Sequence, residues 1–112
     1  MDIRHFLYRI QPTRPAMLTE GPTAVEADVI DRHFRYLQDL VARGVVLQAG
    51  RTTIAGERTF GIVIFRAASE AEATAVMTND PAVREGVMRA ELFPYRVALF
   101  SPAGWTDDAA GA

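Results

Sequence analysis

The stretch from Thr23 to Gly50 constrains the fold most, because it encodes a whole helix that turns directly into a strand. Thr23 and Glu26 form a capping box, in which each residue's side chain accepts a hydrogen bond from the other's backbone N–H. Gly44 is the residue type that most often follows the last turn of a helix. The stretch therefore predicts a helix from residue 23 to Gly44, followed by a strand over residues 45–53.

One residue of this helix departs from its apolar pattern. Ile30, Phe34, Leu37 and Val41 recur at helical spacing and are predicted to build the core. His33 lies about 45° from the centre of this stripe, where a hydrophobic residue is the default. Two interpretations are open. The imidazole is either a structural group hydrogen-bonded at the edge of the core, or a general acid–base group.

The rest of the chain alternates between strand and helix patterns. Ser69 and Glu72 form a second capping box before a shorter helix, and Asp80-Pro81 is typical of the start of a further helical turn. Besides the strand over 45–53, the predicted strands cover residues 3–11, 59–66 and 87–100. Gly50 in the strand over 45–53 suggests a bulge or a close backbone approach.

The predicted order is β-α-β-β-α-β, which is the ferredoxin-like α+β arrangement. It places two helices on one face of a four-stranded antiparallel sheet. Residues 1–102 are expected to form this single domain, and residues 103–112, which are small and unpatterned, a flexible C-terminal tail.

The strand over residues 59–66 is apolar on both sides, which indicates that both faces of the sheet are covered. Two helices on one face leave the other face without a cover. A second copy of the chain would supply one, with the two sheets packed face to face in a homodimer. The alternative is a large exposed apolar patch, which soluble monomers usually avoid.

Composition excludes several kinds of site and partner. Hydrophobic residues make up 49% of the chain, the formal net charge is -2, and there is no cysteine. A thiolate nucleophile and a disulfide are therefore excluded, and no basic patch indicates nucleic acid or a membrane surface. The only two histidines, His5 and His33, have no metal-ligand spacing, so we expect neither a metal nor a cofactor. Charged residues near the N-terminus argue against a signal peptide, so a cytoplasmic location is expected.

Four segments carry a resemblance to a known family. They are RPAMLTEGPT from residue 14, HFRYLQDLVARGVVLQAG from residue 33, FGIVIF from residue 60 and NDPAVREGVMRAELFPYRVAL from residue 79. Together they resemble the YCII-related (YciI-like) family over nearly the whole chain. The resemblance implies a ferredoxin-like fold and a dimer similar to the dimeric α/β barrels. It also implies an active site built on a His-Asp pair in a cleft, and one relative removes chloride from a chlorinated hydroxyquinol.

The resemblance assigns the pair to His33 and Asp80, and a loop arginine to Arg14. Asp80 has a structural role of its own as the N-cap before Pro81, and one carboxylate can do both. Arg14 is either a solvated loop residue or a group that folds over the cleft to bind a carboxylate or phenolate.

Two functions remain open. The first is a small enzyme that uses His33 and Asp80 for acid–base chemistry of the isomerase, lyase or dehalogenase type on a small cyclic or aromatic acid. The second is a non-catalytic dimeric module that binds a small molecule or a partner protein, with His33 in a structural role.

Overall fold

Four strands form one antiparallel sheet in the order β2-β3-β1-β4. The computed structural model describes residues 3–102, so the predicted tail, residues 103–112, lies outside the described residues. The strand bounds are β1 Arg4–Pro12, β2 Val46–Arg51, β3 Gly61–Ala67 and β4 Met88–Tyr95. The two central strands are β1 and β3, as the ferredoxin-like prediction requires.

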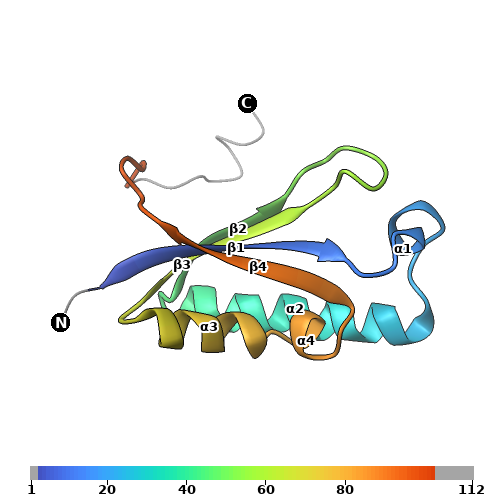
Figure 1. Ribbon diagram of the computed structural model, residues 1–112, viewed down its shortest axis with the longest axis horizontal. Coiled ribbons are helices and arrows are strands. Elements are labelled where there is room, and N and C mark those ends of the chain that lie inside the picture. The colour runs from blue at the N-terminus through green and yellow to red at the C-terminus, as the bar shows by residue number, and fades with distance from the viewer. Residues whose placement is uncertain (1–2, 103–112) are drawn as a thin grey trace.

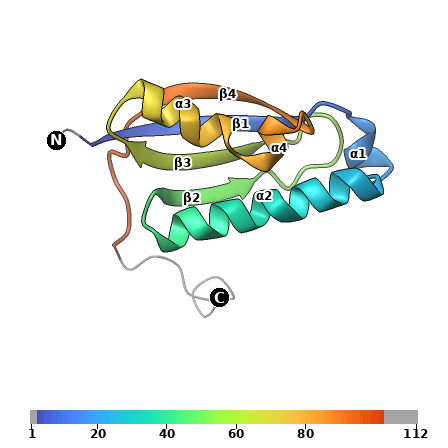
Figure 2. The ribbon, with the colours of Figure 1, turned by 90° about the horizontal axis from the view of Figure 1, so that it is seen from below.

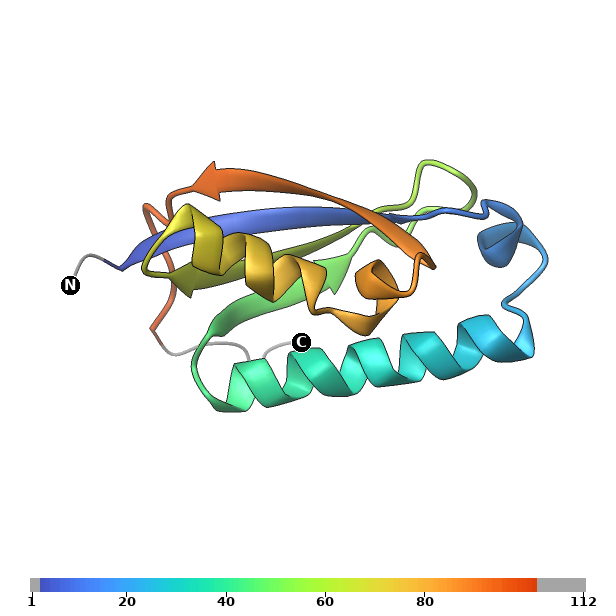
Figure 3. The same ribbon diagram turned by 60° about the horizontal axis from the view of Figure 1, so that its bottom comes forward.

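Two long and two short helices accompany the sheet. They are α1 Ala16–Thr19, α2 Ala24–Ala42, α3 Glu70–Thr78 and α4 Pro81–Arg84. Figure 1 and Figure 3 show α2, α3 and α4 on the same side of the sheet, and no helix of residues 3–102 covers the opposite side. The predicted one-sided arrangement is confirmed. The short helix α1 lies in the connection between β1 and α2, just after Arg14, which the sequence placed on a loop.

The predicted helix caps are present, one of them in altered form. Thr23 Oγ1 accepts from the backbone N–H of Glu26 at 3.1 Å, and Glu26 Oε1 accepts from that of Thr23 at 2.8 Å. Ser69 Oγ accepts from the N–H of Glu72 at 3.1 Å, but the Glu72 carboxylate accepts from Ala68 instead of Ser69. The α2 end is also as predicted, with Gly44 in the left-handed region at φ 74°.

Three strands, β1, β2 and β3, begin and end within two residues of the predictions, and β4 is clearly shorter than predicted. The strand predicted to reach Phe100 ends at Tyr95, and Leu99 and Phe100 are then 92% and 77% exposed. The bulge expected at Gly50 is instead a register shift between Val46 and Gln48.

The core lies between the sheet and the helices. Alternate residues of β1 and β3 face the helices and are buried, and the aromatic rings of Tyr8 and Phe65 meet edge to face with centroids 5.7 Å apart. From α2 the buried residues are Val29, Leu37 and Leu40.

The prediction that the whole apolar stripe of α2 builds the core was wrong for two residues. Phe34 is 60% exposed and Val41 is 52% exposed. The reason is the position of α2. Figure 2 shows that α2 runs alongside the edge strand β2 and not beneath the centre of the sheet. The outer part of its apolar stripe therefore does not reach the strands.

The face of the sheet away from the helices is partly apolar. Cross-strand partners place Leu7, Ile64 and Phe93 side by side on it, and Tyr95 lies further along β4. Phe93 is 37% exposed and Tyr95 43% exposed, whereas Ile64 is only 7% exposed. We call this surface the open face. No helix among residues 3–102 is both long and apolar enough to cross a membrane.

Candidate functional site

The structure brings together the two residues that the resemblance paired, His33 and Asp80. His33 Nδ1 lies 2.8 Å from each carboxylate oxygen of Asp80, although 47 residues separate the two in the chain. The Asp80 side chain is completely buried, and that of His33 is 13% exposed. This is a bifurcated contact between an imidazole and a carboxylate that is shielded from water.

The break between α3 and α4 positions Asp80. Asp80 has an extended backbone with ψ 123°, and Pro81 occupies the first position of α4. Asp80 Oδ1 accepts from the backbone N–H of Ala82 at 2.9 Å, so the predicted N-cap is present. The carboxylate caps a helix and contacts the imidazole at once, as the sequence allowed.

Tyr8 completes the group, and sequence reasoning missed it. Its hydroxyl donates to Asp80 Oδ2 at 2.8 Å, and the residue is fully buried. Burial, the negative charge of Asp80 and this hydrogen bond raise the pKa of Tyr8 far above its ordinary value of 10.0. The hydroxyl therefore stays protonated at neutral pH and donates its hydrogen to Asp80. A tyrosine between Phe6 and Ile10 on the buried side of a strand was the available signal, because its hydroxyl needs a partner there.

A cleft of about 760 Å³ lies between α2 and the adjoining edge of the sheet, and His33 lines it. On the helix side it is also lined by the exposed part of the α2 stripe, including Phe34 and Val41. On the other side it is lined by residues of β2, β3 and the chain between them, among them Arg51, Phe60 and Ile62. The volume and the apolar lining are those of an ordinary small-molecule site.

Arg14 lies outside the lining of this cleft. Its guanidinium donates to both oxygens of Glu26, from Nε at 2.9 Å and from an Nη at 2.5 Å, and also to the carbonyl of Gly21. The hydrogen bond from Arg14 and that from Thr23 lower the pKa of Glu26 to about 2. Arg14 thus ties its loop to the start of α2, and that loop carries Leu18, which does line the cleft.

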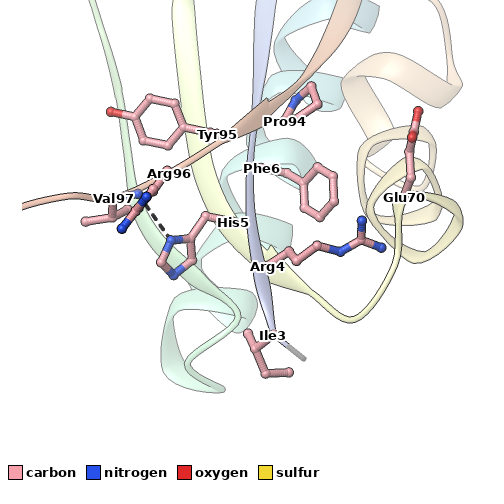
Figure 4. A pocket seen from close by; sticks show the side chains of 9 residues that line it. All are labelled: Ile3, Arg4, His5, Phe6, Glu70, Pro94, Tyr95, Arg96 and Val97. Carbon is pink, nitrogen blue, oxygen red and sulfur yellow. Dashed lines mark hydrogen bonds between the residues drawn. The ribbon is translucent and has the colours of Figure 1, made fainter. Parts of the chain in front are cut away.

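The second histidine lies in a different part of the molecule. His5 lines a pocket of about 420 Å³ where β1 begins and β4 ends, together with Arg4, Glu70 and Arg96. Its Nδ1 accepts from the backbone N–H of Val97 at 3.2 Å, as Figure 4 shows. His5 and His33 do not share a site, and no metal-binding cluster of three or more acidic, histidine or cysteine residues occurs within the described range 3–102.

Two bacterial proteins are among the solved structures with a similar fold. The 5-chloro-2-hydroxyhydroquinone dehydrochlorinase (TftG) of Burkholderia phenoliruptrix AC1100, solved with 2,5-dihydroxybenzoquinone, superposes with a TM-score of 0.59 and 23% identity. The match covers 81% of this chain and 93% of that one. The uncharacterized protein TM1266 of Thermotoga maritima has a TM-score of 0.51 and 9% identity, over 85% of this chain and 100% of that one. At these identities the likeness shows the fold.

Family membership comes from the sequence itself. The model of the YCII-related domain matches residues 6–96, which is most of the chain. None of the curated proteins matches the sequence. The matched region contains His33, Asp80 and every strand of the sheet, except for the first residues of β1. The chain therefore belongs to the YCII-related family.

Proposed function

We propose that this protein is a small enzyme in which His33 acts as a general base, oriented by Asp80, on a cyclic or aromatic acid bound in the cleft. The observation that carries the proposal is the contact of His33 Nδ1 with a buried carboxylate, made by a residue that also lines the cleft. A histidine in this arrangement suits proton transfer near neutral pH.

The partners of Asp80 decide which nitrogen of His33 carries the hydrogen. Tyr8 and the N–H of Ala82 both donate to Asp80, so its carboxylate acts as an acceptor toward every neighbour. His33 must then donate from Nδ1. In the neutral ring this leaves the lone pair on Nε2, the nitrogen on the opposite side of the ring from Asp80, and this nitrogen would take the proton.

The three reaction types expected from the sequence share one step. His33 Nε2 accepts a proton from an O–H or an activated C–H of the ligand, and the ligand keeps the electron pair as a phenolate or enolate. An isomerase returns the proton at another atom. A dehalogenase returns the proton to the ring carbon that carries chlorine, which makes a ketone. Loss of the proton of another ring hydroxyl then supplies the electron pair that expels chloride as the C–Cl bond breaks, and the product is a quinone. The resulting imidazolium is stabilised by the carboxylate of Asp80, as in other His-Asp pairs.

We also propose that the protein is a homodimer in which the open faces pack together. Leu7, Ile64 and Phe93 form an apolar strip on this face, and a second sheet would remove it from water. The cleft lies on the helix side of the sheet and remains accessible in such a dimer.

The tautomer of His33 provides the test of the proposed function. Long-range ¹H–¹⁵N correlation spectra at neutral pH should show the hydrogen on Nδ1, whereas free histidine favours Nε2. Chloride release from a chlorinated hydroquinone, the substrate class of the dehydrochlorinase with a similar fold, should depend on His33 and be lost in His33→Gln. An Nε2–H tautomer in the wild type would instead favour the non-catalytic module with a structural histidine.

A further inference from the structure

The cleft carries one cation that its neighbours do not neutralise, Arg51 at the end of β2. Neither the ion pairs nor the side-chain hydrogen bonds within residues 3–102 include Arg51, and its side chain is exposed. Arg14, Arg32 and Arg35, by contrast, are each paired with a carboxylate. Arg51 is thus available to a ligand where these three are not.

The rest of the cleft lining offers Arg51 no acidic partner. No aspartate or glutamate of the described chain lines the cleft, and apart from His33 its other side chains are apolar or uncharged. The protein as a whole carries a formal net charge of -2, so a cleft without acidic groups is not a consequence of overall composition. An unpaired guanidinium beside an apolar surface selects ligands that combine an anionic group with a hydrophobic body.

We infer that Arg51 is the anion-binding residue of the cleft and that the ligand is an aromatic or cyclic anion. Its ring would contact the apolar surface formed by Phe34, Val41 and Ala49, and its carboxylate, sulfonate or phenolate would pair with Arg51. This inference deepens the proposed function, since it concerns the same cleft. It assigns to Arg51 the part that the sequence suggested for Arg14, whose guanidinium is held by Glu26.

A pair of fluorescent probes with the same ring system tests the inference. 1-Anilinonaphthalene-8-sulfonate carries an anionic group, and N-phenyl-1-naphthylamine lacks it. We expect Arg51→Gln to weaken binding of the sulfonate about fivefold, the effect of an exposed ion pair, and to leave the neutral probe unchanged. Arg35→Gln is the matched control, because Arg35 lies on the exposed side of α2 and is paired with Asp31.

Amide chemical-shift changes locate the bound probe. The sulfonate should perturb Gly50 and Gly61, which line the cleft, and not Leu7 or Phe93 on the open face. Equal weakening of both probes by Arg51→Gln, no weakening of either, or binding confined to the open face would overturn the inference. Failure of both probes to bind would overturn it as well.

The two proposals fail separately. Probe binding requires no proton transfer, so its outcome does not depend on the tautomer of His33. An Nε2–H tautomer together with Arg51-dependent binding would reject only the general base. The Nδ1–H tautomer without Arg51-dependent binding would reject only the anion site.

Discussion

Replacing Asp80 by asparagine separates the shape of the buried group from its charge. The amide has nearly the size of the carboxylate, and its oxygen can still accept from the backbone N–H of Ala82. Its NH₂ then faces Tyr8 and His33, which both donate in the wild type. The hydroxyl can rotate to accept. The amide oxygen at the Oδ1 position is still within reach of His33 Nδ1, but an Nδ1–H would then also face the NH₂ at the Oδ2 position, and moving the hydrogen to Nε2 removes this contact between two donors. Asp80→Asn should therefore switch the tautomer of His33.

The magnitude follows from the hydrogen bonds of Asp80. Its carboxylate accepts from three groups, namely Tyr8, Ala82 and His33. Each charge-assisted hydrogen bond is about 1 kcal/mol stronger than its neutral equivalent, which gives a loss of about 3 kcal/mol. The neutral amide is easier to bury, which offsets part of this loss. We expect the free energy of unfolding to fall by about 2 kcal/mol and the melting temperature by about 10 °C.

Three measurements check this prediction. Imidazole ¹⁵N shifts report the tautomer, urea unfolding reports stability, and any turnover that depends on His33 should fall on the order of 10⁴-fold, as expected for a base in the wrong tautomer. Asp31→Asn is the control, because Asp31 is an exposed partner of Arg35 with 64% of its side chain accessible. An Asp80→Asn protein that is folded and keeps the wild-type tautomer would refute the reasoning.

The remaining predictions concern other parts of the structure. Tyr8→Phe should lower the free energy of unfolding in urea by about 1–2 kcal/mol, because Asp80 loses a donor. The hydrogen bonds from Arg14 and from the backbone of Thr23 lower the pKa of Glu26 from 4.5 to about 2, so these contacts stabilise the fold above pH 4.5 and less as the pH falls toward 2. As the pH is lowered from 4.5 to 2, the melting temperature of Glu26→Gln should accordingly fall less than that of the wild type. Sedimentation should show a dimer at micromolar concentration and a monomer for Phe93→Asp, and a monomeric wild type would reject face-to-face packing.

Local signals predicted most of the fold. The capping box at Thr23, the left-handed Gly44 and the Asp80-Pro81 step each depend on neighbours in the chain, and all three occur as predicted. Their order sufficed for the ferredoxin-like topology, because short antiparallel and right-handed connections leave few alternatives. The ends of strands were less predictable. Nothing in the alternation of residues 96–100 shows that pairing with β1 stops at Tyr95.

The candidate site was predictable in part. The pairing of His33 with Asp80 came from the family resemblance, since no spacing rule links residues 47 positions apart. Tyr8 was missed because the period of a strand shows which face a side chain occupies, not which group it meets. Arg14 pairs with Glu26, the carboxylate that folding brings near it. The sequence pattern indicates Glu26 only as part of a helix cap, so it does not predict this pair.

The exposed part of the α2 stripe has a consequence for finding the natural ligand. Phe34 and Val41 are 60% and 52% exposed, so the folded protein leaves apolar surface in water that a bound ring would cover. Any compound that binds only the folded form raises its stability, by about 2.7 kcal/mol at a concentration 100 times its Kd. For a chain of this size that corresponds to a rise in melting temperature of about 12 °C. A thermal-shift screen of aromatic anions can thus identify ligands of this cleft before any reaction is known.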